Sequence, residues 1–157
     1  MGKVLAIYIA PDSGAPMERI PSVRAVAGVG LEGDRYAVNK GMFQKAGKKP
    51  EKIRHVTLIA AEAILAANGG QVETFSREET RRNIVTYEVD LDRLIGKEFR
   101  IGTVRMLGTE TATPCTQPSI LAGKKDPTCF KAQFAGRGGI RAEILSDGEI
   151  AIGDPIA

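Results

Sequence analysis

Residues 98–110 read EFRIGTVRMLGTE, two short runs in which apolar and polar side chains alternate on either side of Gly102. Alternation with a period of two is typical of β-strands that bury one face. A glycine between two such runs favours a tight turn. We therefore expect strands over residues 98–101 and 103–110, joined directly at Gly102.

Similar signals recur along the chain. Further runs with strand character cover residues 4–10, 22–27, 55–59 and 83–89. A β-hairpin is predicted from residues 139–145 and 149–152, because the Asp-Gly pair at 147–148 favours a type I′ turn. Short helical segments are expected over residues 60–68, 76–82, 91–95 and 130–134. Many short strands and few helices predict a mainly β fold with short helices (α+β), built as a curved or barrel-like sheet.

A glycine motif, GVGLEG at residues 28–33, matches the pattern of dinucleotide-binding turns. That pattern needs a helix directly after the glycines, and residues 34–41 carry no apolar helical stripe. We therefore interpret the glycines as a tight turn that presents Asp34 and Arg35.

The composition is that of a globular domain, with 157 residues, 43% hydrophobic and 26% charged. No run is long enough to span a bilayer, and the apolar run at residues 4–10 lacks the features of a signal peptide. We expect a single cytoplasmic domain over residues 1–157, without a membrane partner. Basic residues outnumber acidic ones between 35 and 54, which attracts anions. Few aromatic side chains interleave with them, so we do not expect nucleic acid as a partner.

A second segment, TATPCTQPSIL at residues 111–121, places Cys115 in a loop bounded by prolines and surrounded by hydroxyl groups. No acidic residue lies between Glu110 and Asp126, so nothing nearby in sequence opposes a thiolate. Such a cysteine can act as a nucleophile or as a soft metal ligand. The alternative is a buried cysteine that packs as a small hydrophobe. Cys115 and Cys129 do not form a disulfide framework, and no Cys/His cluster indicates zinc.

Four segments could contribute to an anion site: the turn at 33–35, the Arg-Arg-Asn segment at 81–83, the Cys115 loop, and the glycine-rich segment at 136–139. Guanidinium groups and glycine-permitted backbone N–H groups both bind anions. Taken singly, each segment has a structural alternative, either a surface ion pair or a bend before a strand. Whether the four segments form one anion site depends on whether the fold brings them together.

Several segments form a recognisable combination: GLEGDRYA (30–37), VTLIAAEAI (56–64), RRNIVT (81–86), VDLDRLIGKEFRIG (89–102), Pro114-Cys115, GRGGIRAEIL (136–145) and GEIAIGDPI (148–156). Together they resemble the MOSC domain, which forms the C-terminus of molybdenum-cofactor sulfurase and also occurs alone in bacteria. The resemblance runs in order from about residue 23 to 156. It implies a sheet of the MOSC and pyruvate-kinase β-barrel-like type, and binding of the molybdenum cofactor, molybdopterin.

The resemblance also implies roles for individual residues. Cys115 matches the family cysteine, which is the molybdenum ligand in the amidoxime-reducing members and receives sulfur as a persulfide in sulfur-handling proposals. The other matched positions, where the resemblance implies cofactor binding, are Asp34, Arg35, Arg82, Asn83, Arg137 and Gly138. Asp34 is expected to orient Arg35 or Arg82.

Two functions follow from this resemblance. One is a molybdenum-dependent oxidoreductase that reduces N-hydroxylated compounds with an electron-donor protein as partner. The other is a sulfur-carrier or cofactor-delivery protein that holds a persulfide on Cys115 and receives sulfur from a donor protein. A generic anion-binding barrel is a third reading. Pyridoxal phosphate belongs to the sulfurase domain and is not expected, since no lysine stands out as a Schiff-base candidate. The chain departs from the family pattern at Thr113 and Ala112, where related proteins often carry glutamate and cysteine.

Overall fold

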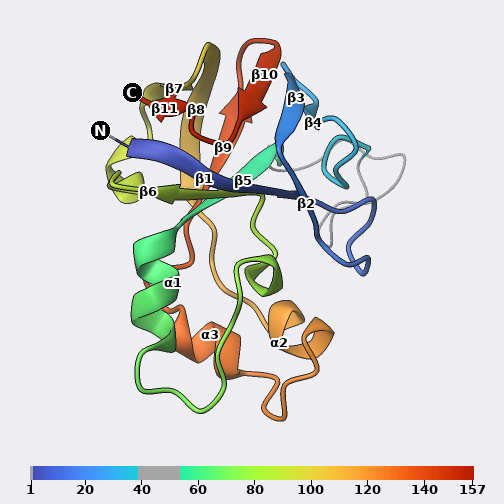
Figure 1. Ribbon diagram of the computed structural model, residues 1–157, viewed down its shortest axis with the longest axis vertical. Helices are drawn as coiled ribbons and strands as arrows, with labels where there is room; N and C mark the ends of the chain where they lie inside the picture. Colours follow the sequence, from blue (N-terminus) through green and yellow to red (C-terminus); the bar gives the residue numbers. More distant parts are fainter. Residues whose placement is uncertain (1, 39–53) are drawn as a thin grey trace.

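The computed structural model describes residues 2–38 and 54–157. Figure 1 shows a layer of strands with short helices gathered on one side of it. In chain order the elements are β1 (Gly2–Ile9), β2 (Glu18–Ile20), β3 (Ser22–Val26), β4 (Gly30–Leu31), β5 (Val56–Ala60), α1 (Ala61–Asn68), η1 (Glu78–Thr80), β6 (Ile84–Tyr87), η2 (Leu91–Leu94), β7 (Glu98–Ile101), β8 (Val104–Thr111), α2 (Gln117–Leu121), α3 (Cys129–Gln133), β9 (Ile140–Ile144), β10 (Gly148–Ala151) and β11 (Pro155–Ile156).

The main sheet closes into a barrel. Among the described residues its seven strands follow the order β11-β7-β8-β9-β5-β6-β1, and β11 pairs with β1 to complete the ring. β5 and β6 run parallel, whereas the other neighbours in the ring run antiparallel. β2 extends the sheet beyond β1, and β10, β3 and β4 form a small second sheet. The prediction of a mainly β, barrel-like fold is confirmed.

The strands predicted over residues 98–110 are present as β7 and β8. Phe99 and Ile101 of β7 lie opposite Met106 and Val104 of β8, and all four side chains are buried in the barrel. Gly102 joins the strands with a φ of 59°, a left-handed conformation that glycine adopts without strain. The alternating pattern therefore forms the barrel interior, as the period of two predicts.

A second apolar cluster packs the helices against the outside of the barrel. Phe75, Phe130 and Phe134 are fully buried. The rings of Phe130 and Phe134 stack at 4.4 Å, and Phe75 meets the Phe130 ring edge-on at 5.1 Å. Ile59 of β5 and Val85 of β6 join them from the sheet. Aromatic packing of this kind is strongly stabilising, and it fixes α3 beneath the barrel (Figure 1).

The predicted hairpin between residues 139–145 and 149–152 is wrong. Both segments are strands, but β10 pairs with β3 and not with β9. Both edges of β9 are already occupied, by β8 on one side and β5 on the other, so β10 has no edge of β9 to join. The Asp147 carboxylate instead accepts a hydrogen bond from the backbone N–H of Ala27 at 2.7 Å. The Asp-Gly pair therefore carries the chain from the barrel to the small sheet.

No helix within residues 2–38 and 54–157 has the length and apolar character needed to cross a membrane.

Candidate functional site

Strand register brings the predicted site segments to one end of the barrel. Leu58 of β5 lies opposite both Ile84, the first residue of β6, and Ile140, the first residue of β9. Thr111, the last residue of β8, also lies opposite Ile140. The segments just before β6 and β9 and just after β8 therefore meet. They carry Arg82, Gly138 and Cys115.

Cys115 lies in the loop between β8 and α2. The loop begins at Ala112, whose backbone N–H donates to the carbonyl of Gly139 at 2.8 Å. Cys115 is partly exposed, whereas Cys129 is buried with its Sγ 3.5 Å from the Ser119 hydroxyl. Of the two cysteines in the sequence, Cys115 is thus the accessible one.

Arg82 ties this loop to the segment before β9. Its Nε donates to the carbonyl of Gly138 and its Nη2 to the carbonyl of Ala112, each at 2.8 Å. The side chain is buried, and burial lowers the pKa of Arg82 to about 10. It remains a cation at neutral pH, and its charge lies within electrostatic reach of Cys115.

Gly138 allows the two segments to approach closely. A Cβ at this position would lie 2.5 Å from the carbonyl oxygen of Ala112 and 2.8 Å from Cγ of Pro114. Both distances are too short for any side chain, so glycine is required by packing. The predicted site residue Gly138 therefore contacts the Cys115 loop directly.

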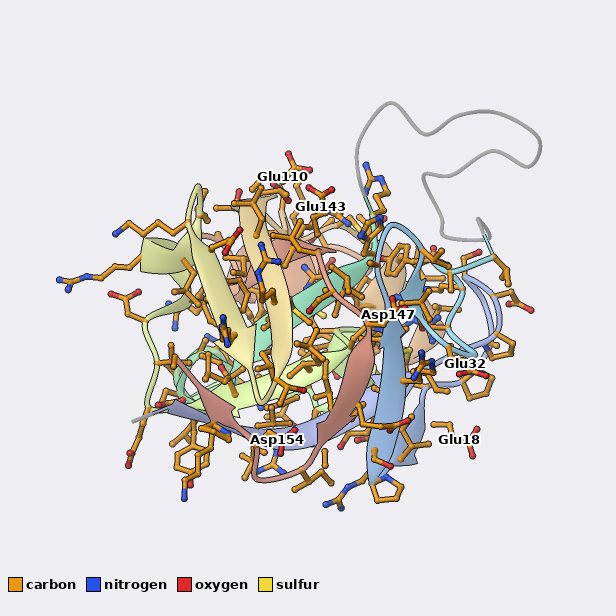
Figure 2. All side chains as sticks on the ribbon, turned by 90° about the horizontal axis from the view of Figure 1, so that it is seen from above. Glu18, Glu32, Glu110, Glu143, Asp147 and Asp154 are labelled. Atoms are coloured by element: carbon orange, nitrogen blue, oxygen red, sulfur yellow. The ribbon has the colours of Figure 1, made fainter. Side chains whose placement is uncertain are left out.

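A cavity of about 250 Å³ opens beside Cys115. Its lining comprises Arg54, Glu110, Thr111, Thr113, Pro114, Cys115 and Arg141. Glu110 and Arg141 lie opposite each other on β8 and β9 and form an ion pair, with Oε1 3.6 Å from Nε. Figure 2 shows Glu110 at the end of β8, pointing away from the barrel. Its described lining residues thus include the Cys115 thiol, two guanidinium groups and one carboxylate.

Asp34 and Arg35 connect their turn to the residue after β1 and to the segment before β6. Asp34 is fully buried, and its Oδ1 accepts hydrogen bonds from the backbone N–H of Ala10 and from Nη1 of Arg35, each at 3.1 Å. Arg35 also donates from Nη2 to the carbonyl of Arg81 at 3.0 Å. The expected orientation of Arg35 by Asp34 is present. As predicted, residues 28–33 lead into turns, and no helix follows them in the described residues up to Val38.

Asn83 joins three strands beneath the site. Its Oδ1 accepts hydrogen bonds from the backbone N–H and the hydroxyl of Thr57, at 3.0 and 3.1 Å. Its Nδ2 donates to the carbonyl of Tyr8 at 3.1 Å. Asn83 is fully buried, so its amide holds β1 and β5 on either side of the start of β6.

Arg137 lies at a different place. It is exposed and lines a cavity of about 350 Å³ together with residues of α1 and η2. A smaller cavity of about 130 Å³ lies between, because it shares Asp92 and Gly136 with the Arg137 cavity and Thr113 and Pro114 with the Cys115 cavity. The fold thus brings Arg82, Gly138 and Cys115 together and places Arg137 further along the same row of cavities.

Three residues of the site were not singled out by the sequence pattern: Tyr36, Arg54 and Arg141. Burial raises the pKa of the Tyr36 phenol, but the charges of Arg35, Arg141 and Arg82 together outweigh burial and leave the pKa below its ordinary value. Arg54 belongs to the basic segment recognised in the sequence, most of which, residues 39–53, lies outside the described residues. Arg141 is identified only by the register that places it opposite Glu110.

The family model of the MOSC domain matches residues 51–157. Among solved structures, the YuaD protein from Bacillus subtilis is 20% identical, with a TM-score of 0.80 over 99% of this chain and 94% of that chain. YiiM from Geobacillus stearothermophilus is 15% identical, with a TM-score of 0.68 over 100% of this chain and 74% of that chain. YiiM from Escherichia coli is 16% identical, with a TM-score of 0.66 over 98% of this chain and 68% of that chain. At these identities the structures show a shared fold. No curated protein matches the chain.

Proposed function

Because the chain belongs to the MOSC domain family, which is associated with the molybdenum cofactor, we propose that it binds this cofactor at the barrel end that carries Cys115. The observation that supports the proposal most directly is the pair of hydrogen bonds from Arg82 to the carbonyls of Ala112 and Gly138. They hold the loop of a partly exposed cysteine beside a cavity that Arg54 and Arg141 line.

The residues of this site suit the chemistry of the cofactor. Molybdenum accepts a soft thiolate ligand, and Cys115 offers one at the cavity wall. The cofactor also carries a phosphate, which guanidinium groups bind well. When bound, the cofactor supplies the metal centre for oxygen-atom and electron transfer. In this proposal Cys115 is the metal ligand, and Arg82 and Gly138 set the position of its loop.

The remaining predicted site residues have supporting roles in the proposal. Asp34, Arg35 and Asn83 keep the turns before β6 in place through the buried hydrogen bonds described above. Arg137 is assigned to the part of the cofactor furthest from Cys115, because it lines the far cavity of the row. We propose that this cytoplasmic, single-domain protein reduces N-hydroxylated compounds with electrons from a donor protein.

We retain a sulfur-carrier function as the alternative, because Ala112 and Thr113 stand where related proteins often carry cysteine and glutamate. Among the described lining residues, the one carboxylate of the Cys115 cavity, Glu110, is paired with Arg141. Cations beside a cysteine also stabilise an anionic persulfide on that cysteine. In this alternative Cys115 carries sulfur from a donor protein without stable metal.

One experiment separates the two functions. The protein is purified from cells that make the cofactor, and molybdenum and cyanide-releasable sulfur are measured for the wild type, Cys115→Ala and the control Cys129→Ala. Stoichiometric molybdenum that is lost only in Cys115→Ala supports cofactor binding. Sulfur without molybdenum, again lost only in Cys115→Ala, supports the sulfur carrier. A wild-type protein with neither signal refutes both.

A further inference from the structure

Arg141 has a hydrogen-bond donor, Nη1, that no described residue accepts. It lies on β9 with Glu110 of β8 on one side and Thr57 of β5 on the other. Its side chain is only 11% exposed. Its Nη1 is buried, and among residues 2–38 and 54–157 no atom accepts a hydrogen bond from it. A buried donor without an acceptor is costly, so a ligand that supplies an acceptor here gains binding energy.

The charges around Arg141 favour an anion as that ligand. Among the described lining residues of the cavity, Arg54 and Arg141 are cations and Glu110 is the anion. Burial and then the charge of Arg141 lower the pKa of Arg54, so the two guanidinium groups repel each other across the cavity. The Glu110 carboxylate lies 3.6 Å from Nε of Arg141, which is beyond ordinary hydrogen-bond distance. Nη1 of Arg141 has no hydrogen-bond acceptor among the described residues, Glu110 included.

We infer that the Cys115 cavity contains an oxyanion subsite in which Arg141 is the specificity-determining residue. Its ligand is a carboxylate, phosphate or sulfonate group of a small molecule, because a guanidinium binds such groups through paired N–H donors. The cavity volume of about 250 Å³ admits a small anion next to the thiol. The inference stands on the cavity itself and holds whether or not the cofactor binds.

The test uses two alkylating reagents of similar size, one negatively charged and one neutral. Iodoacetate is an anion and iodoacetamide is neutral, and both modify an accessible thiol. The rate of modification of Cys115 is measured by peptide mass spectrometry on protein made in cells that lack the cofactor. The ratio of the iodoacetate rate to the iodoacetamide rate reports the affinity of the cavity for an anion and cancels changes in thiol reactivity.

We expect this ratio to fall at least about fivefold in Arg141→Gln, the effect of one unit charge at close range. Arg141→Lys retains the charge and should keep most of the ratio. Arg105→Gln removes a charge near the opposite end of β8, where Arg105 pairs with Glu98, and should leave the ratio unchanged. Inorganic phosphate should slow both reagents in the wild type and have little effect on Arg141→Gln.

A ratio that is the same in wild type and Arg141→Gln, with both proteins folded by circular dichroism, overturns the inference. So does a wild type in which phosphate gives no protection. Repeating the phosphate titration on cofactor-loaded protein identifies the source of the anion. Loss of protection there means that the cofactor's own phosphate fills the subsite, and retained protection means that a separate anionic ligand does. Failure to load the cofactor refutes the proposed function and leaves the result on the cofactor-free protein intact.

Discussion

Replacing Arg82 by methionine should release the Cys115 loop. The change keeps a long, flexible side chain but removes the donors to the carbonyls of Ala112 and Gly138, both at 2.8 Å. Hydrogen bonds to a charged group contribute about 1.5–3 kcal/mol each, and the cost of burying the cation offsets part of that sum. We expect a net loss of about 2–4 kcal/mol, which lowers the Tm of a domain of this size by roughly 5–15 °C.

Two measurements check this prediction. Urea unfolding gives the loss of stability, and the rate of iodoacetamide modification of Cys115 reports the freedom of its loop, so the rate should rise in Arg82→Met. Arg93→Met is the matched control, because the Arg93 side chain is 83% exposed and forms a surface ion pair with Asp90. That variant should remain within about 0.5 kcal/mol of the wild type.

The reasoning is refuted if Arg82→Met unfolds at the same urea concentration as Arg93→Met and Cys115 reacts at the wild-type rate. Arg82→Lys gives a further check. A lysine keeps the charge but lacks the planar fork that reaches two carbonyls at once. Relative to Arg82→Met, we expect Arg82→Lys to recover part of the lost stability. We expect its rate of Cys115 modification to return less completely to the slow wild-type rate.

Three further predictions follow from single contacts. Gly138→Ala should cost about 1–3 kcal/mol in urea unfolding through overpacking against the loop, whereas Gly14→Ala, which meets only an aspartate oxygen at 3.8 Å, should be nearly neutral. Burial lowers the pKa of His55, so the unfolded chain takes up a proton first as the pH falls below about 6.5, and stability should decline as the pH falls further. His55 Nδ1 accepts a hydrogen bond from the backbone N–H of Ile144 at 2.9 Å. His55→Asn, which offers an acceptor but does not titrate, should remove that decline, and an unchanged pH profile would contradict the assignment. In native protein a thiol reagent should modify Cys115 and spare Cys129, and equal reaction of both would show that the buried cysteine is accessible.

The sequence predicted the strands well and their partners less well. Alternation over residues 98–110 and the glycine at 102 are local properties, and the structure reproduces both in β7 and β8. The failed hairpin has a different origin. The pairing of β10 with β3 depends on which edges remain free after the barrel has closed, and no local pattern encodes that.

The site residues also fall into two groups, those that the sequence identifies and those that only the packing identifies. Arg82, Gly138 and Cys115 were found because their segments match a family pattern, and the fold brings them into contact. Arg141 was not singled out, because its importance comes from the register opposite Glu110 and from a buried guanidinium nitrogen. Both are properties of three-dimensional packing.

The closure of the barrel by β1 and β11 has a consequence for how the chain folds. Gly2 pairs with Ile156 and Lys3 with Pro155, so the two strands that complete the ring come from opposite ends of the sequence (Figure 1). Contacts of such long sequence separation form slowly. On the ribosome the ring stays open until residue 156 has emerged, and β1 and β7 expose unpaired edges in the meantime. Open edges promote association between chains, so the pairing of β11 with β1 and β7 is also the step that protects these edges from aggregation.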